Sequence, residues 1–163
     1  MVAAVLTVRA SKVAVVRNTA ARTRTVTDLQ LQAAQVERAH AELNRWINVD
    51  RDRWNWATEN LHAALSTMYP PDWSTIVTEL QIGDTNAVEP AIVFLEADPR
   101  CFRSGYEKEQ LCRFLGRTEL TTRQRHRLLA IADRASHDSH RPLRERRAFA
   151  RLEARLVSLT DQG

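Results

Sequence analysis

The fold of this chain is decided by residues 28–68, which read DLQLQAAQVERAHAELNRWINVDRDRWNWATENLHAALSTM. Apolar side chains recur through this stretch at alternating spacings of four and three, as in the a and d positions of a heptad. The twelve positions of this seam are Leu29, Ala33, Val36, His40, Leu43, Ile47, Asp50, Trp54, Ala57, Leu61, Ala64 and Met68. The stretch contains no glycine or proline, so the pattern predicts helix along its length.

Both ends of this stretch carry helix-boundary signals. Thr27 or Asp28 can cap its start, because a short polar side chain accepts hydrogen bonds from the free N–H groups of a first helical turn. The helix is expected to end at Tyr69, since Pro70 follows and a residue before proline is driven out of the α region.

The weak point of the seam lies at residues 48–52, where Asn and Asp side chains favour helix caps over helix interiors. Asp50 can be the N-cap of a second helix, in which case 28–47 and 51–69 form an antiparallel hairpin. The unbroken spacing favours one long helix, whereas the polar cluster favours two. We favour the hairpin, because two helices bury a seam that a single helix leaves exposed. We expect the buried seam residues to include Leu43, Ile47, Trp54 and Leu61.

The second half of the chain is divided by caps, prolines and glycines into short helices. The first is expected from Trp73, capped by Asp72, to about Gln81, and the second from Pro90 to Ala97. The others are expected from a Ser104/Glu107 capping box to Gly116, from a Thr121/Gln124 capping box to about Ser136, and from Pro142 onward with Phe149, Leu152, Leu156 and Leu159 on one face. The segment 91–97 is apolar on nearly every side and is expected to be buried.

These segments predict an all-α fold. A long helix or helical hairpin over 28–69 is followed by a compact array of short helices over 72–160, since capped helices with short loops pack as arrays. Together they form a single domain over 28–163, which follows a basic N-terminal arm over 1–27.

Part of the second half resembles a known kind of helical protein. Helix-pair segments of uncharacterised bacterial proteins with a HEAT-like α-solenoid character are similar to Phe94-Leu95-Glu96-Ala97-Asp98-Pro99, to Phe102-Arg103-Ser104-Gly105-Tyr106 with Lys108-Glu109, and to Leu120-Thr121 with Gln124. The resemblance covers about residues 91–155 and brings no functional residues with it. It implies a helical protein-binding scaffold from a bacterium.

Charge is sorted along the sequence into three blocks. Residues 1–27 carry five basic and no acidic side chains, 28–112 carry seven basic and fourteen acidic, and 113–163 carry twelve arginines and six acidic residues. The net charge of +4 therefore hides an acidic middle between two Arg-rich ends. Charge distribution bears on partners rather than on fold. We expect the C-terminal arginines to pair with carboxylates of this chain or of a partner.

The sequence contains no motif for catalysis, for a cofactor or for a metal. Cys101 and Cys112 have neither zinc-site nor redox-motif spacing, and Cys112 is expected to be a small buried apolar residue. His137 and His140 are expected to lie in a solvated loop, because no third His or Cys is near them in sequence. We expect no enzyme activity, no cofactor, no metal, no membrane contact and a cytoplasmic location.

Two groups of side chains are the predicted partner-binding residues. Trp46 and Trp56 lie off the seam beside several arginines, and aromatic and Arg side chains dominate protein interfaces. The second group is a stripe on the last helix with spacings of three and four, made of Arg144, Arg147, Arg151 and Arg155.

The predicted function follows from these two groups. We expect a non-catalytic helical protein-interaction module or assembly subunit. Its partner is another protein or a second copy of the chain, the latter docking through the 28–68 seam. The alternative is a nucleic-acid-associated protein that uses the Arg-rich C-terminal helices.

Overall fold

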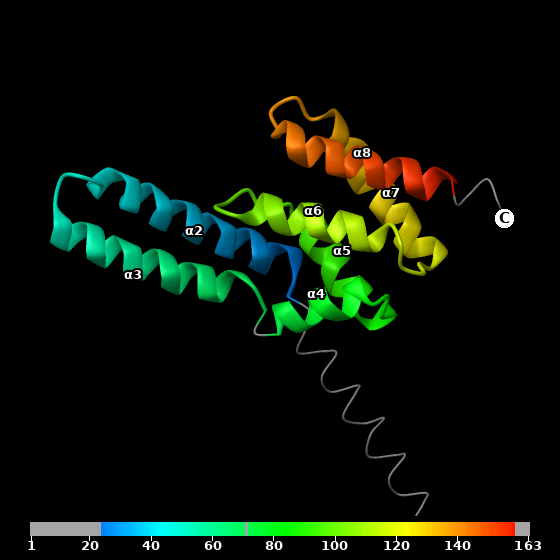
Figure 1. Cartoon of the computed structure of the whole chain (residues 1–163), viewed down its shortest axis with the longest axis horizontal. Helices are drawn as coiled ribbons and strands as arrows, with labels where there is room; N and C mark the ends of the chain where they lie inside the picture. Colours follow the sequence, from blue (N-terminus) through cyan, green and yellow to red (C-terminus); the bar gives the residue numbers. More distant parts are fainter. Residues whose placement is uncertain (1–23, 71, 159–163) are drawn as a thin grey trace, which may run out of the picture.

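The computed structural model of the chain describes residues 24–70 and 72–158. These residues form helices α2 (Val26–Trp46), α3 (Arg51–Met68), α4 (Trp73–Gln81), α5 (Val88–Ala97), α6 (Ser104–Leu115), α7 (Thr122–His137) and α8 (Leu143–Ser158), with a 3₁₀ turn, η1, at Thr85–Ala87 (Figure 1). No strand occurs in the described ranges, and the all-α prediction is confirmed. Residues 1–23 of the predicted arm and the predicted core residue Leu159 lie outside the described residues.

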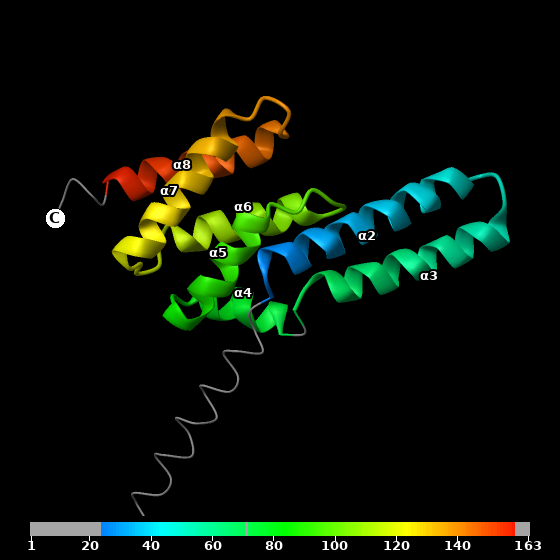
Figure 2. The same ribbon diagram turned by 180° about the vertical axis from the view of Figure 1, so that it is seen from behind.

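Helices α2 and α3 form the hairpin that the Asn/Asp cluster favoured (Figure 2). Asp50 is the N-cap of α3, and its Oδ1 accepts hydrogen bonds from the backbone N–H groups of Asp52 and Arg53, both at 3.0 Å. Asn48, in the turn before it, has a positive φ of 60°, which Asn tolerates better than most residues. The long seam is therefore folded back on itself.

The start of α2 differs from the prediction. Thr25, rather than Thr27 or Asp28, is the N-cap, and its Oγ1 accepts a hydrogen bond from the N–H of Asp28 at 3.1 Å. The Asp28 carboxylate in turn accepts one from the N–H of Thr25 at 3.2 Å. All three residues are good caps in isolation, and this reciprocal capping box selects Thr25.

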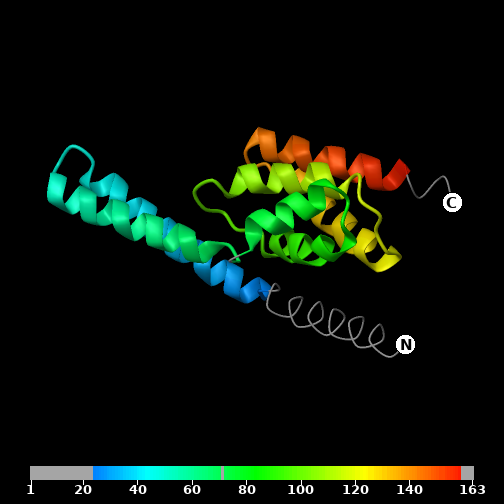
Figure 3. The same ribbon diagram turned by 60° about the horizontal axis from the view of Figure 1, so that its bottom comes forward.

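The seam is buried at the base of the hairpin and open toward its end. Most of its buried members lie where the hairpin meets the other helices, namely Leu29, Ala33, Val36, Leu61 and Met68. Farther out, Leu43 is half-buried, while Ile47 and Trp54 are 52% and 37% exposed. The prediction of burial is thus right for Leu61 and wrong for Ile47 and Trp54. The reason is visible in Figure 3, where the outer turns of the hairpin project beyond every other helix.

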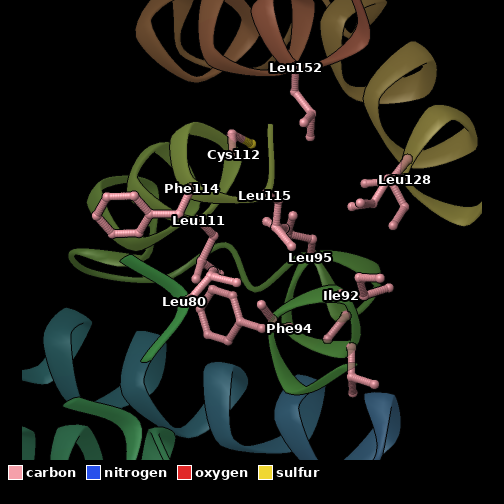
Figure 4. Packing of buried hydrophobic residues seen from close by; sticks show 14 of the residues in the cluster. Leu80, Ile92, Phe94, Leu95, Leu111, Cys112, Phe114, Leu115, Leu128 and Leu152 are labelled. Carbon is pink, nitrogen blue, oxygen red and sulfur yellow. The ribbon is translucent and has the colours of Figure 1, made fainter. Parts of the chain in front are cut away.

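Helix α5 is the central element of the array. Eight of its ten residues are buried, as the all-round apolar segment predicted. Side chains from α4, α6 and α7 converge on it, including Leu80, Leu111 and Leu128 (Figure 4). Phe94 also packs against the exit of the hairpin, with its ring centre 5.9 Å from that of Tyr69 and 4.8 Å from that of Trp73. One apolar core therefore joins the base of the hairpin to the array.

An ion cluster with two buried cations, Lys108 and Arg141, and two partly buried carboxylates holds α8 against α5 and α6. The Asp98 carboxylate accepts hydrogen bonds from Lys108 Nζ at 2.9 Å and from both terminal nitrogens of Arg141 at 2.9 and 2.6 Å. Glu145 on α8 accepts one from Arg141 at 2.9 Å and lies 3.5 Å from Lys108 Nζ. Burial alone raises the pKa of Asp98, but the hydrogen bonds from Arg141 and Lys108 outweigh it and lower that pKa to about 2.

Backbone geometry makes room for this cluster. Asp98 is the C-cap of α5 in the left-handed region, with φ 46° and ψ 53°, where non-glycine residues are uncommon. Gly105 lies in the first turn of α6, where an added Cβ would stand 2.5 Å from Oε1 of Glu145. The missing side chain at Gly105 therefore leaves the space that the Glu145 carboxylate occupies.

The predicted capping box of α6 does not form. Ser104 is the first residue of the helix rather than its cap, and its hydroxyl donates to the carbonyl of Cys101 at 2.8 Å. Arg103, with φ 68°, stands at the N-cap position. The intended partner, Glu107, instead accepts a hydrogen bond from the indole N–H of Trp73 at 3.1 Å. A tertiary contact thus replaces the local one that the sequence favoured.

The other predicted boundaries lie close to the observed ones. Thr121 and Gln124 form the reciprocal capping box at the start of α7. Pro142 precedes α8 rather than lying within it, and its carbonyl accepts the hydrogen bond from the N–H of Arg146. Gly116 is the C-cap of α6, as predicted. None of the helices in the described part of the chain combines the length and apolar character of a membrane span.

Candidate functional site

Two hollowed surfaces lie far apart on the molecule. We call the first the tip: it is the outer end of the hairpin, where Trp46, Ile47, Asn48, Val49, Asp50, Arg51 and Trp54 line a hollow of about 430 Å³. We call the second the α6/α8 groove. It lies on the array, and the turn between α2 and α3 is at the opposite end of the long axis from the C-terminal helices (Figure 1).

The tip exposes apolar side chains around a fixed aromatic ring. Val49 is 71% exposed and Ile47 projects beside it. The indole N–H of Trp46 donates to the Glu42 carboxylate at 2.5 Å, and the Arg53 guanidinium lies 4.5 Å from the centre of the ring. A hydrogen bond at the edge of the ring and a cation–π contact over its face therefore both favour this orientation of Trp46.

The two predicted partner-binding tryptophans are not brought together. Trp56 is 57% exposed, but it does not line the hollow of the tip. It follows Trp54 by two residues, which places it about 200° farther around α3. The second tryptophan that lines the hollow together with Trp46 is Trp54, which the seam pattern predicted to lie in the core.

The four predicted arginines of the α8 stripe also do not form one site. Arg144, Arg147, Arg151 and Arg155 are all exposed. Arg144 makes an ion pair with Glu109, and its guanidinium lies 4.8 Å from the centre of the Tyr106 ring. Arg151 and Arg155 line the α6/α8 groove, whereas Arg147 does not.

The α6/α8 groove has basic walls and an apolar floor. It encloses about 500 Å³ and is lined by Glu109, Cys112, Arg113, Gly116, Arg117, Ala148, Arg151, Leu152 and Arg155. Cys112 and Leu152 are buried beneath it and approach each other from α6 and α8 (Figure 4). Arg113 and Arg117 were not among the residues predicted from the sequence, although Arg113 follows Glu109 by four residues on one face of α6 and Arg117 lies just past the end of that helix.

Other arginines of the C-terminal block pair with the acidic middle of the chain, as the charge blocks predicted. Arg127 donates to Glu96 at 2.7 and 2.8 Å and to Glu89 at 2.5 Å. Arg141 and Arg144 pair with Asp98 and Glu109 in the same manner. In contrast, none of the four groove arginines makes an ion pair within residues 24–70 and 72–158.

The thiols of this chain are unsuited to nucleophilic attack. Burial raises the pKa of Cys112 to about 12, and burial also raises the pKa of Cys101. Both therefore stay protonated near neutral pH, where a reactive cysteine has to be a thiolate. In the part of the chain that the structure describes, no three His, Cys, Asp or Glu side chains are grouped as metal ligands.

Comparison with protein-family models, with curated proteins and with solved structures finds no match to this chain. The HEAT-like resemblance of residues 91–155 therefore stays a prediction. The tip and the α6/α8 groove are the two surfaces of the described residues on which a function can rest.

Proposed function

We propose that this chain is a non-catalytic assembly subunit that pairs with a second copy of itself through the tip of the hairpin. One observation carries the proposal: Ile47, Val49 and Trp54 expose apolar surface around a hollow at the end of a projecting arm. Apolar residues scattered singly over a surface need no explanation, but a group of them marks an interaction site. The proposal includes a cytoplasmic, reducing location, which the free thiols of Cys101 and Cys112 support.

The features of the tip favour a second copy over an unlike partner. A two-fold interface has to be complementary to itself, because the same patch stands on both sides. The tip offers both a protruding side chain, Val49, and a hollow beside it. Its charges are also of both signs, with Asp50 and Asp52 next to Arg51 and Arg53, so a strongly acidic or basic partner gains little from it.

The proposed interface at the tip covers only part of the 28–68 seam that the sequence predicted as the docking surface. The base of the seam is buried within the chain by α2, α3 and their neighbours and leaves no surface for a second copy. Only the outer turns remain open, and two hairpins that overlap there place four helices around a shared core. This arrangement is that of a four-helix bundle, in which each helix buries one apolar stripe.

The test is the oligomeric state of the full chain and of a double variant, Ile47→Asp with Val49→Asp. Sedimentation equilibrium from about 1 to 200 μM should show a monomer–dimer equilibrium in the wild type and a monomer in the variant. Both side chains are exposed, so the melting temperature of the monomer should change little.

Ile82→Asp is the matched control, because Ile82 is 78% exposed and lies away from the tip, at the end of α4. This variant should dimerise like the wild type. A wild type that stays monomeric at about 200 μM would contradict the proposal. Equal loss of dimer in the control would show general apolar association instead.

A further inference from the structure

The α6/α8 groove concentrates charge that the described residues do not neutralise. Arg113 and Arg117 are four residues apart on one wall, and Arg151 and Arg155 are four apart on the other. Arg151 and Arg155 stand one helical turn apart on α8, where like charges repel each other, and Arg117 lies just past the end of α6. The one carboxylate that lines the groove is Glu109, which already pairs with Arg144. The groove between the packed helices α6 and α8 is therefore positively charged.

The charge continues past the end of α6. A second hollow of about 410 Å³ shares Gly116, Arg117 and Arg155 with the groove and adds Arg125. The Nε of Arg125 is buried and has no hydrogen-bond partner among the described residues. The positive charge of the groove therefore extends past the end of α6.

The floor of the groove sets a second condition on what binds there. Cys112 and Leu152 are buried below it, and Gly116 and Ala148 carry little or no side chain. A ligand that fills this space has to bring small apolar groups to the floor together with anions for the walls. Free phosphate or another small inorganic anion meets only the second of these conditions.

We propose that the α6/α8 groove binds an acidic helical segment of a partner protein. Its carboxylates would lie one turn apart on either side of a small apolar side chain, in register with the arginines of the two walls. Helix α6 is about 18 Å long, which matches about three turns of such a segment. Arg pairs with carboxylates through two parallel hydrogen bonds, so each wall can hold the partner in a defined orientation.

The molecule already contains this mode of pairing. Arg144 of α8 reaches Glu109 on the facing helix α6, and Arg127 of α7 forks onto Glu96 of α5. A third helix in the groove would repeat the same contact with the arginines that have no carboxylate of their own among the described residues.

A protein segment fits this surface better than nucleic acid does. Glu109 lines the groove and Glu119 lines the continuing hollow, and they repel a phosphate backbone and partner carboxylates alike, so the apolar floor is what favours a protein segment. The hollow between α6 and α8 has room for side chains, whereas a rigid duplex would rest on its rims and leave the apolar floor unused. Nucleic-acid binding by the same arginines is therefore the competing outcome of the test.

The test uses the full chain and two probes at about 150 mM salt, where weak non-specific contacts are screened. The first probe is a fluorescein-labelled helical peptide of Glu, Ala and Leu with its Glu residues one turn apart. The second is a labelled duplex DNA of arbitrary sequence. Binding is measured by fluorescence anisotropy.

Two triple variants distinguish the effect of the groove arginines from the effect of the total positive charge of the protein. The groove variant replaces Arg113, Arg151 and Arg155 by Gln, and the control replaces Arg123, Arg134 and Arg147, which are exposed and do not line the groove. Both remove the same charge. We expect the groove variant to bind the peptide at least about tenfold more weakly than the wild type, and the control within about twofold.

Three results would overturn the inference: equal weakening by the two variants, no binding of the peptide by the wild type, or tighter binding of the DNA than of the peptide. If DNA binding falls with salt at a log–log slope of about −0.9 per phosphate and is lost in the groove variant, the groove belongs to nucleic acid. The inference stands apart from pairing at the tip, since the Ile47→Asp, Val49→Asp variant should bind the peptide as the wild type does.

Discussion

The hairpin and the C-terminal array are both built of helices, yet different interactions hold them. The hairpin has one seam shared by two helices, and beyond its base most of its apolar side chains are only partly covered. The array surrounds a buried central helix, α5, and adds the ion cluster of Asp98, Lys108, Arg141 and Glu145. Few buried contacts mean low local stability, whereas a shared core makes several helices unfold together. We therefore expect the tip to open locally and the array to unfold as a unit.

The largest effect should come from breaking the ion cluster. Asp98→Asn leaves Lys108 and Arg141 buried with Glu145 as their one remaining carboxylate, and removing one partner of a buried ion pair costs about 3–5 kcal/mol. Urea unfolding of the full chain measures this loss. Asp52→Asn at the exposed start of α3 is the control and should change the free energy of unfolding by less than about 0.5 kcal/mol. Equal losses in the two variants would mean that the cluster contributes nothing special to the array.

The next effect compares two positions on the hairpin itself. Leu61→Ala removes a buried side chain near the base and should cost about 2–5 kcal/mol, since a cavity remains. Leu43→Ala removes a half-buried one farther out and should cost about half as much. Urea unfolding should be run at low protein concentration, so that pairing of copies does not cover the tip. Similar costs at the two positions would show that the hairpin is packed evenly along its length.

Local signals in the sequence were sufficient for much of the hairpin. The competition of Asn and Asp for backbone hydrogen bonds placed the cap at Asp50, and the apolar spacing placed Leu61 in the core. The same spacing failed for Ile47 and Trp54, because periodicity tells which face of a helix is apolar but not whether a neighbour covers it. That depends on where the surrounding helices end.

The array and the α6/α8 groove depend more on contacts between distant residues. Asp98 meets Lys108 ten residues away and Arg141 forty-three residues away, which no local pattern indicates. Glu107 accepts a hydrogen bond from the indole of Trp73 instead of forming the capping box predicted with Ser104. The groove needs Arg113 of α6 and Arg117 after its end as well as the arginines of α8, and only those of α8 were identified, because the packing of these two helices could not be derived from the sequence.

Acid should weaken the array through Asp98. The folded pKa of about 2 lies below the ordinary 3.8, so the carboxylate stabilises the fold above about pH 4 and loses this contribution as the pH falls toward 2. Because solvent reaches part of the side chain, the effect should be about 1–2 kcal/mol. It is smaller than the loss in Asp98→Asn, because the amide N–H groups of Asn also face the donors of Lys108 and Arg141. Urea midpoints measured from pH 5 down to pH 2 should fall more steeply for the wild type than for Asp98→Asn. Parallel slopes would contradict the assignment.

The smallest effect should come from the cap at Asp50, and it bears most directly on the tip. Asp50→Ala removes the acceptor for the N–H groups of Asp52 and Arg53, and loss of such a cap costs about 1 kcal/mol. Asp50→Asn is the matched control, because Asn caps a helix about as well as Asp. Thr121→Ala removes the corresponding cap of α7 in the array and should cost a similar amount.

Asp50→Ala and Thr121→Ala should cost similar free energies of unfolding but should affect different parts of the molecule. At the tip, Asp50→Ala should speed hydrogen exchange in the first turns of α3 alone, because these turns open without the rest of the molecule. Since the same turns carry Trp54, this variant should also weaken pairing of copies, although it leaves every exposed apolar side chain of the tip in place. Thr121→Ala should leave pairing unchanged. If Asp50→Ala instead raised exchange evenly through the hairpin and the array, the two regions would form a single cooperative unit, and the open seam at the tip would not be a sign of local instability.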